Sequence, residues 1–183
     1  MKKIFFVFLL ALTSCMPNYE RAAVQQDYSQ APLMELPVSR VSIKSDVGDM
    51  EPLPHVEKTM KMTPERQLKS WATIRLRPNY QTENKAEFVI RKASMIRDDA
   101  PEASFFTYDN YKYTLKYAIT LAIKDDNGKV LRSVDLDGFL SRKLPKKASE
   151  DQRNNMFTLM LQDLEKSLDQ QMPEQIRQNL LDQ

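Results

Sequence analysis

The fold is decided by residues 111–140, which read YKYTLKYAITLAIKDDNGKVLRSVDLDGFL. From residue 111 to residue 124, larger apolar side chains alternate without a break with lysine, threonine and alanine, as in a strand with one buried face. At about 3.3 Å per residue this strand would be roughly 46 Å long. The alternation stops at Asn127-Gly128, a strong signal for a two-residue hairpin turn of type I′. The stretch therefore predicts a long β-hairpin.

Placing Asn127 and Gly128 at the turn determines which residues face each other across the hairpin. Asp126 then opposes Lys129, and apolar residues meet apolar residues along one face. The predicted pairs are Leu121 with Val134, Ile119 with Leu136, Tyr117 with Gly138 and Leu115 with Leu140. A slip by one residue would turn the polar residues of the second strand toward the core, so this register is well specified.

Two helices are predicted, one before and one after the hairpin. The first begins at Thr63-Pro64-Glu65, which offers a capping side chain, a proline suited to the first helical position and an acid at the positive end of the dipole, and it ends at Pro78-Asn79. The second begins with the capping box Ser149-Glu150-Asp151-Gln152, is interrupted by Pro173 and continues as a shorter helix. The apolar stripes are Leu68, Trp71, Ala72 and Leu76 in the first helix, Phe157, Met160, Leu161, Leu164 and Leu168 in the second, and Ile176, Leu180 and Leu181 beyond the proline.

Two further strands complete the pattern. Residues 38–44 are rich in β-branched side chains, and residues 86–97 alternate loosely. In the second of these, Phe88, Ile90 and Ile96 are expected on one side and Val89, Ala93 and Met95 on the other. The resulting order, β-α-β-β-β-α, predicts an α+β fold with one antiparallel sheet and two helices packed on one face. We expect this single domain to occupy residues 37–183.

The amino terminus predicts a lipid-anchored protein. Met1-Lys2-Lys3 is a short cationic start, and the apolar run 4–12 is shorter than the roughly 20 residues of a membrane-spanning helix but fits a signal peptide. Leu12-Thr13-Ser14-Cys15 resembles the lipobox of bacterial lipoproteins. That resemblance implies cleavage after residue 14 and a diacylglycerol and an N-acyl chain, such as palmitate, on Cys15, with no other cofactor. The alternative is an ordinary signal peptide with an incidental cysteine near its end.

The residues after Cys15 bear on where the protein lies. Residues 16–36 show no period of 2 or 3.6, so residues 15–36 are interpreted as the lipidated cysteine and a flexible tether. Position 16 is Met rather than the Asp that tends to retain lipoproteins of this class in the inner membrane, which implies the periplasmic face of the outer membrane. Without Lys2 and Lys3 the 27 basic residues become 25, equal to the 25 acidic ones, so no nucleic-acid partner is expected.

The composition favours binding over catalysis. One cysteine, one histidine and three glycines rule out an internal disulfide, the usual zinc ligand sets and a phosphate-binding glycine loop. The candidates for acid-base or metal chemistry are His55 and the acidic pairs Asp98-Asp99, Asp125-Asp126 and Asp135 with Asp137. Surface charges and cross-strand ion pairs are the simpler interpretation. We therefore expect no enzymatic activity and no metal site.

The link between the third and fourth predicted elements is unusually aromatic. Residues 101–111 connect two strands, yet they carry four aromatic side chains where loops are normally polar. Two roles stay open: a contact for a partner or lipid, or a loop that folds back over the end of the sheet. The candidate contacts are Phe105, Phe106, Tyr108, Tyr111 and Tyr113.

The anchor and the order of elements resemble small envelope lipoproteins that assist larger machines. In element order only, the chain is similar to the lipopolysaccharide-assembly lipoprotein and to auxiliary lipoproteins of ABC-type lipid transporters, although Met16-Pro17 replace the Gly and aromatic residue usual after the lipidated cysteine in the first family. A closer similarity is to uncharacterised Gram-negative lipoproteins, which bring no assigned activity. It is carried by Pro54-His55-Val56-Glu57, Thr63-Pro64, Trp71-Ala72 and Arg75-Leu76. The resemblance implies a non-enzymatic accessory or assembly factor of an envelope protein complex, and the alternative is a periplasmic carrier of lipid or another hydrophobic ligand.

Overall fold

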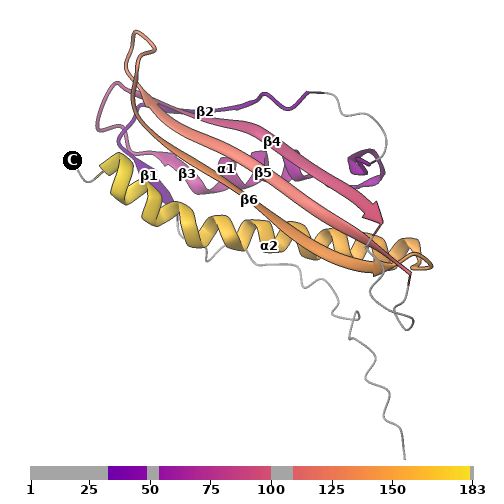
Figure 1. The fold of residues 1–183 in the computed structure, drawn as a ribbon. Helices are drawn as coiled ribbons and strands as arrows, with labels where there is room; N and C mark the ends of the chain where they lie inside the picture. The colour runs from indigo at the N-terminus through magenta and orange to yellow at the C-terminus, as the bar shows by residue number, and fades with distance from the viewer. Residues whose placement is uncertain (1–32, 49–53, 100–108, 182–183) are drawn as a thin grey trace, which may run out of the picture.

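The computed structural model describes residues 33–48, 54–99 and 109–181, and its centre is a four-stranded sheet (Figure 1). The spatial order of the strands is β2-β4-β5-β6. Their bounds are Arg40–Ser45 for β2, Lys85–Asp99 for β4, Asn110–Lys124 for β5 and Val130–Pro145 for β6. The helices are α1, Pro64–Arg75, and α2, Glu150–Ile176. The predicted α+β class is confirmed.

The sheet is mixed, whereas the sequence predicted an antiparallel one. Strands β4, β5 and β6 are antiparallel, but β2 runs parallel to β4, with Arg40 opposite Lys85 and Ser45 opposite Ile90. The physical reason is that α1 lies between β2 and β4 in the chain. A helical crossover returns the chain to the end of the sheet where it started, so the next strand points the same way.

A second, two-stranded parallel sheet joins β1, Met34–Leu36, to β3, Leu76–Pro78. Met34 and Leu36 are buried while Glu35 between them is exposed. The ordered domain therefore begins inside the range 15–36 that was interpreted as a tether, because three alternating residues are too few to stand out in the sequence. Residues 16–32 lie outside the described part of the chain.

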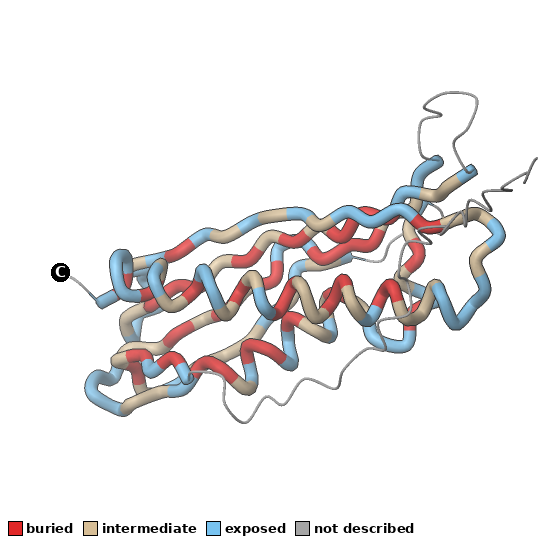
Figure 2. The backbone as a smooth tube through the Cα atoms, turned by 90° about the horizontal axis from the view of Figure 1, so that it is seen from below, coloured by how far each residue is buried: buried red, intermediate tan, exposed pale blue. Residues whose placement is uncertain are grey.

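Both helices cover the same face of the main sheet. Trp71 of α1 packs against Phe88 of β4, with 6.0 Å between the ring centroids, and Phe157 of α2 packs against Tyr113 of β5 at 5.4 Å. Phe88 pairs with Leu121, which lies on the same face of β5 as Tyr113. In Figure 2, buried residues alternate with exposed ones along the strands and the long helix, so each element has one buried side.

The helix starts agree with the sequence, but the interruption of α2 does not. The Thr63 side chain accepts a hydrogen bond from the Arg66 amide, and Ser149 and Gln152 form the reciprocal capping box. Helix α2 continues through Pro173 to Ile176 and ends in a π-helical turn, η3, Arg177–Leu181. The buried stripe continues across the proline at four-residue intervals, and its packing outweighs the backbone hydrogen bond that a proline removes. This stripe is Leu168, Met172, Ile176 and Leu180.

The hairpin register is confirmed and the turn type is wrong. All four predicted pairs between residues 115 and 140 are present. At the tip, Gly128 N–H donates to Asp125 O at 3.0 Å, and Lys124 pairs with Val130. Only Gly128 of the two turn residues has a positive φ, 82°. This geometry is a type I turn closed by a glycine bulge, which inserts one residue and removes the predicted pairing of Asp126 with Lys129.

A second bulge, at Arg91 in β4, explains why the alternation of residues 86–97 is loose. Ile90 pairs with Ile119 and Lys92 with Ala118, so Arg91 is an extra residue. The bulge reverses the side-chain phase, and Phe88 and Ile90 share the buried face with Ala93 and Met95. The predicted grouping of Ile96 with Phe88 is therefore wrong.

Gly138 of β6 is required by a close approach. A Cβ atom at this position would lie 2.8 Å from Tyr117 Oη and 2.9 Å from two ring carbons. We expect Gly138→Ala to lower the free energy of unfolding by about 1–3 kcal/mol, as overpacking in a filled core does. Urea unfolding measures the change. Ser133→Ala, on the exposed face of the same strand, is the control, and Tyr117→Leu should relieve the cost in the double variant. Equal stability of the Gly138 and Ser133 variants would contradict the account.

The outer face of the sheet carries a cross-strand ion triad at Glu87. Its carboxylate accepts hydrogen bonds from Lys124 Nζ at 2.5 Å and from Lys44 Nζ. The two lysines hold the pKa of Glu87 below its ordinary value of 4.5, against a smaller opposing effect of burial. Because the folded pKa is the lower one, this carboxylate stabilises the fold above pH 4.5 and loses its contribution as the pH falls through the folded value.

We therefore expect Glu87→Gln to flatten the loss of stability between about pH 5 and pH 3. Urea midpoints measured across this range would show it. Glu83→Gln, which removes an exposed carboxylate from the turn before β4, should leave the pH dependence of the urea midpoint unchanged. A Glu87→Gln slope equal to that of the unmodified chain would show that the triad contributes nothing.

Candidate functional site

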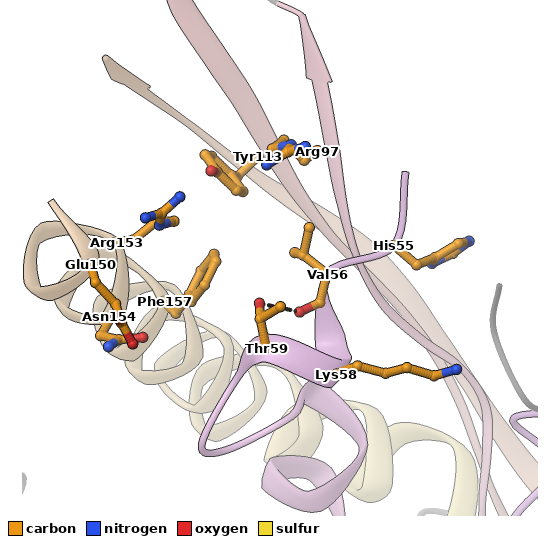
Figure 3. Close-up of a pocket in the computed structure, with 10 residues that line it drawn as sticks. All are labelled: His55, Val56, Lys58, Thr59, Arg97, Tyr113, Glu150, Arg153, Asn154 and Phe157. Atoms are coloured by element: carbon orange, nitrogen blue, oxygen red, sulfur yellow. Dashed lines mark hydrogen bonds between the residues drawn. The ribbon is translucent and has the colours of Figure 1, made fainter. Parts of the chain in front are cut away.

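A cleft of about 420 Å³ opens at the end of the sheet farthest from the hairpin tip. Its walls come from the end of β4, the start of β5, the 3₁₀ turn η2 (Glu57–Thr59) and the first turns of α2 (Figure 3). The uncharged lining residues are Val56, Thr59, Tyr113, Asn154 and Phe157, and the titratable or charged ones are His55, Lys58, Arg97, Glu150 and Arg153.

The segment Pro54-His55-Val56-Glu57 holds η2 against β4. The Val56 amide donates to Met95 O at 3.0 Å, and the Arg97 amide donates to Pro54 O at 2.7 Å. The Glu57 carboxylate accepts a hydrogen bond from the Met95 amide at 2.5 Å. This motif, which carries part of the resemblance to uncharacterised lipoproteins, thus builds one wall of the cleft by extending the edge of β4.

The floor of the cleft is aromatic. Tyr113 is 1% exposed and meets Phe157 edge to face. Tyr111 is T-shaped against Tyr113, at 6.4 Å between centroids, and the Arg97 guanidinium lies 4.5 Å from the Tyr111 centroid. Of the five predicted contact residues, the structure therefore places Tyr113 in the cleft wall and Tyr111 beside it. Phe105, Phe106 and Tyr108 lie outside the described residues.

The charges around the cleft are mainly positive. Three cations, Lys58, Arg97 and Arg153, line it with one carboxylate, Glu150. Across residues 33–48, 54–99 and 109–181, no carboxylate forms an ion pair with Arg97 or Arg153. Figure 3 shows these two side chains on either side of Tyr113 and above Phe157, while Lys58 and His55 lie beyond Val56. The arrangement offers an apolar floor with two guanidinium groups facing it.

Lys146 joins the ends of β4 and β5 next to the cleft. Its Nζ lies 2.9 Å from Asp99 Oδ1 and 2.8 Å from Asp109 Oδ1, and its amide donates to Asp109 O at 2.9 Å. Hydrogen bonds to these two carboxylates, first to Asp109 and then to Asp99, raise the pKa of Lys146 above its ordinary value. Lys146 therefore ties the two strand ends together, on the side of the sheet where Arg97 and Tyr111 stack.

The acidic pairs and His55 do not converge. Asp126 pairs with Lys85 at the hairpin end of the sheet, Asp99 pairs with Lys146 at the other end, and Asp135 accepts from Thr120 in between. Cross-strand ion pairs of the predicted kind are present, with Arg91 as the cation at Asp135. His55 Nδ1 lies 3.4 Å from Glu57 Oε1. Within the described residues no group of acidic, histidine or cysteine side chains could hold a metal ion.

The remaining motif residues, Trp71 and Arg75, join the two helices. Trp71 Nε1 donates to Asp169 Oδ1 at 2.8 Å. Arg75 donates from Nε to the same oxygen at 2.8 Å and from Nη2 to Asp169 Oδ2 at 3.0 Å. Arg75 is 1% exposed. The sequence showed Trp71 and Arg75 as a motif but not their acceptor, because Asp169 lies 94 residues beyond Arg75.

No protein-family model and no curated protein sequence matches the chain. Several solved structures are similar in shape. A minor lipoprotein from Acinetobacter baumannii is 15% identical with a TM-score of 0.41, over 74% of this chain and 92% of that one. An uncharacterised lipoprotein B from Nitrosomonas europaea is 20% identical with a TM-score of 0.44, over 80% and 87%. A rare lipoprotein B from Shewanella oneidensis is 8% identical with a TM-score of 0.40, over 76% and 94%.

These structures are named as lipoproteins of Gram-negative bacteria, the class that the chain resembles in sequence. At these identities and TM-scores the likeness carries no argument about activity or partner. In the described part of the chain, no helix is both long and apolar enough to cross a membrane.

Proposed function

We propose that this chain is a bacterial lipoprotein, attached through Cys15 to the periplasmic face of the outer membrane, whose domain is a non-enzymatic accessory of an envelope protein complex. The observation that carries the proposal is the order of features in the first fifteen residues. A cationic start, nine apolar residues and Leu12-Thr13-Ser14-Cys15 follow one another at the offsets of a lipoprotein signal, and Cys15 is the only thiol in the chain.

The position of the cleft supports a partner on the side away from the anchor. The domain begins at β1, which pairs with β3 just before β4 starts, and the cleft lies where β4 ends. Figure 1 shows β1 and the start of α2 at opposite ends of the sheet. At about 3.3 Å per residue, the fifteen residues of β5 separate these ends by roughly 50 Å.

The length of chain before the domain limits how far it can stand from the membrane. Residues 16–33 can span at most about 60 Å when fully extended. The lipid anchor therefore holds the β1 end of the domain within that distance of the bilayer surface. When the long axis of the sheet points away from the membrane, the cleft end of the domain is the part farthest from the bilayer. A cleft at this end of the domain supports an accessory role, because a periplasmic protein or the periplasmic part of a membrane complex can reach it.

Site-specific photocrosslinking of the full-length lipoprotein in intact envelopes tests the proposal. A photoreactive residue at Asn154, in the cleft, should give one defined crosslinked envelope protein that also co-purifies with the unmodified lipoprotein after gentle solubilisation. The matched control is the same residue at Lys129, on the exposed hairpin tip, which should not give this product. Recovery of the lipoprotein alone from both positions would count decisively against an accessory role.

A second candidate function is binding of a hydrophobic ligand, favoured by the aromatic floor of the cleft. The volume of about 420 Å³ is within the range of small-molecule sites, and Val56, Tyr113 and Phe157 supply apolar lining. Native mass spectrometry of residues 16–183, expressed without the signal sequence and Cys15 and extracted without detergent, should then show a bound small molecule. A spectrum with the polypeptide mass alone would contradict this second function.

A further inference from the structure

We propose that the cleft binds a small amphiphile with one anionic head group, held between Arg97 and Arg153, and an apolar part that lies against Val56 and Phe157. The inference rests on the second candidate function, the binding of a hydrophobic ligand, and adds the chemistry of the head group.

The floor of the cleft is apolar and held in place by the fold. Val56 and Phe157 are buried in the fold, and Phe157 is held edge to face against Tyr113. Val56 precedes η2 and is fixed by its backbone hydrogen bond to β4, and Phe157 lies in α2, whose start is fixed by the capping box. A preformed apolar surface of this kind strengthens binding, because the protein loses little conformational freedom when the ligand binds.

The two guanidinium groups provide the head-group site. Arg97 comes from β4 and Arg153 from α2, both are partly exposed, and neither is paired with a carboxylate of the described chain. The central carbon of the Arg97 guanidinium lies 4.5 Å from the Tyr111 ring centroid, a cation–π contact that restrains the side chain. The N–H groups that do not face the ring can bind a ligand oxygen. Carboxylates and phosphates accept such pairs of N–H donors in a bidentate manner.

The charge balance favours an anion over a neutral head group. Arg97 and Arg153 line the same cleft, so both positive charges favour an anion there, whereas a neutral head group gains nothing from them. Glu150 also lines the cleft and lies beside Asn154 in Figure 3, below Arg153. Its carboxylate disfavours a head group with several negative charges, so a carboxylate, which carries one, fits best.

Isothermal titration of residues 16–183, expressed without the signal sequence and Cys15, tests the inference. The ligands are decanoate, decyl phosphate and decyl glucoside below their micelle concentrations, and inorganic phosphate alone. The two anionic amphiphiles should bind at least about tenfold more tightly than the neutral glucoside, because only an anion forms charge-assisted hydrogen bonds with the guanidinium groups. Inorganic phosphate should bind much more weakly than decyl phosphate.

Variants test separately how the two arginines and the apolar floor contribute to binding. Arg97→Gln with Arg153→Gln should remove the preference for the anions, so that decanoate binds no more tightly than decyl glucoside, and Arg97→Lys should keep part of the preference. The control is Arg91→Gln, which removes an exposed arginine outside the cleft, where it pairs with Asp135. Asn154→Trp, which fills the cleft, should abolish binding of all three amphiphiles.

The outcomes distinguish the inference from the function on which it rests. Equal affinity for decanoate and decyl glucoside would overturn the head-group assignment and leave the hydrophobic site standing. Inorganic phosphate binding as tightly as decyl phosphate would overturn the role of the apolar floor. Binding of none of the amphiphiles would overturn both the inference and the second candidate function.

Discussion

Replacing Asp169 by alanine is expected to lower the free energy of unfolding by about 3–5 kcal/mol, the cost of removing one partner of a buried ion pair. Asp169 accepts three hydrogen bonds, one from Trp71 and two from Arg75, and these donors hold α1 against α2. Arg75 is almost fully buried, so its guanidinium would lose a bidentate carboxylate where water cannot replace it. Urea unfolding of the purified mature domain measures the loss.

The matched control is Asp163, on the same helix and also paired with an arginine. Its partner is Arg142 of β6, and both side chains are more than 40% exposed. An exposed pair of this kind contributes about 0–1 kcal/mol, so Asp163→Ala should be nearly neutral. Asp169→Asn keeps an oxygen acceptor, so its loss of unfolding free energy should lie between those of Asp163→Ala and Asp169→Ala. If Asp163→Ala and Asp169→Ala cost the same, the buried pair is not what joins the helices.

Much of the fold could be predicted because its signals are local. The alternation of residues 111–124 and the turn at Asn127-Gly128 predicted the register of the hairpin, and capping residues predicted the starts of both helices. The failures concern features that depend on neighbours. The bulge at Arg91 and the parallel pairing of β2 follow from how strands are stacked and connected, which the alternation of one strand does not show.

The candidate site could be predicted only in part, for the same reason. Tyr113 stood out as an aromatic residue in the long strand, and the structure places it in the cleft wall. Val56 and Phe157 come from segments far apart in the chain, and no spacing in the sequence brings them together. Arg97 and Arg153 each look like ordinary surface arginines in the sequence, and only the fold places them around one aromatic floor.

The second large effect is expected at the amino terminus, where Cys15→Ser should abolish lipid attachment and cleavage of the signal sequence. Cys15 is the only thiol, so no other side chain can accept the thioether-linked lipid. The unmodified protein should fractionate with membranes, since anchoring by more than one acyl chain is effectively permanent. The serine variant should keep its signal sequence and migrate as the larger precursor. Met16→Asp is the informative companion: it should retain the lipid but move the protein from the outer to the inner membrane.

Metabolic labelling with radioactive palmitate, compared between the unmodified chain and Cys15→Ser, tests the central claim most directly. The account predicts a labelled mature band in the first case and no label in the second, at equal amounts of protein. Equal labelling of the two chains, or no labelling of either, would contradict the assignment of this protein as a lipoprotein anchored through Cys15.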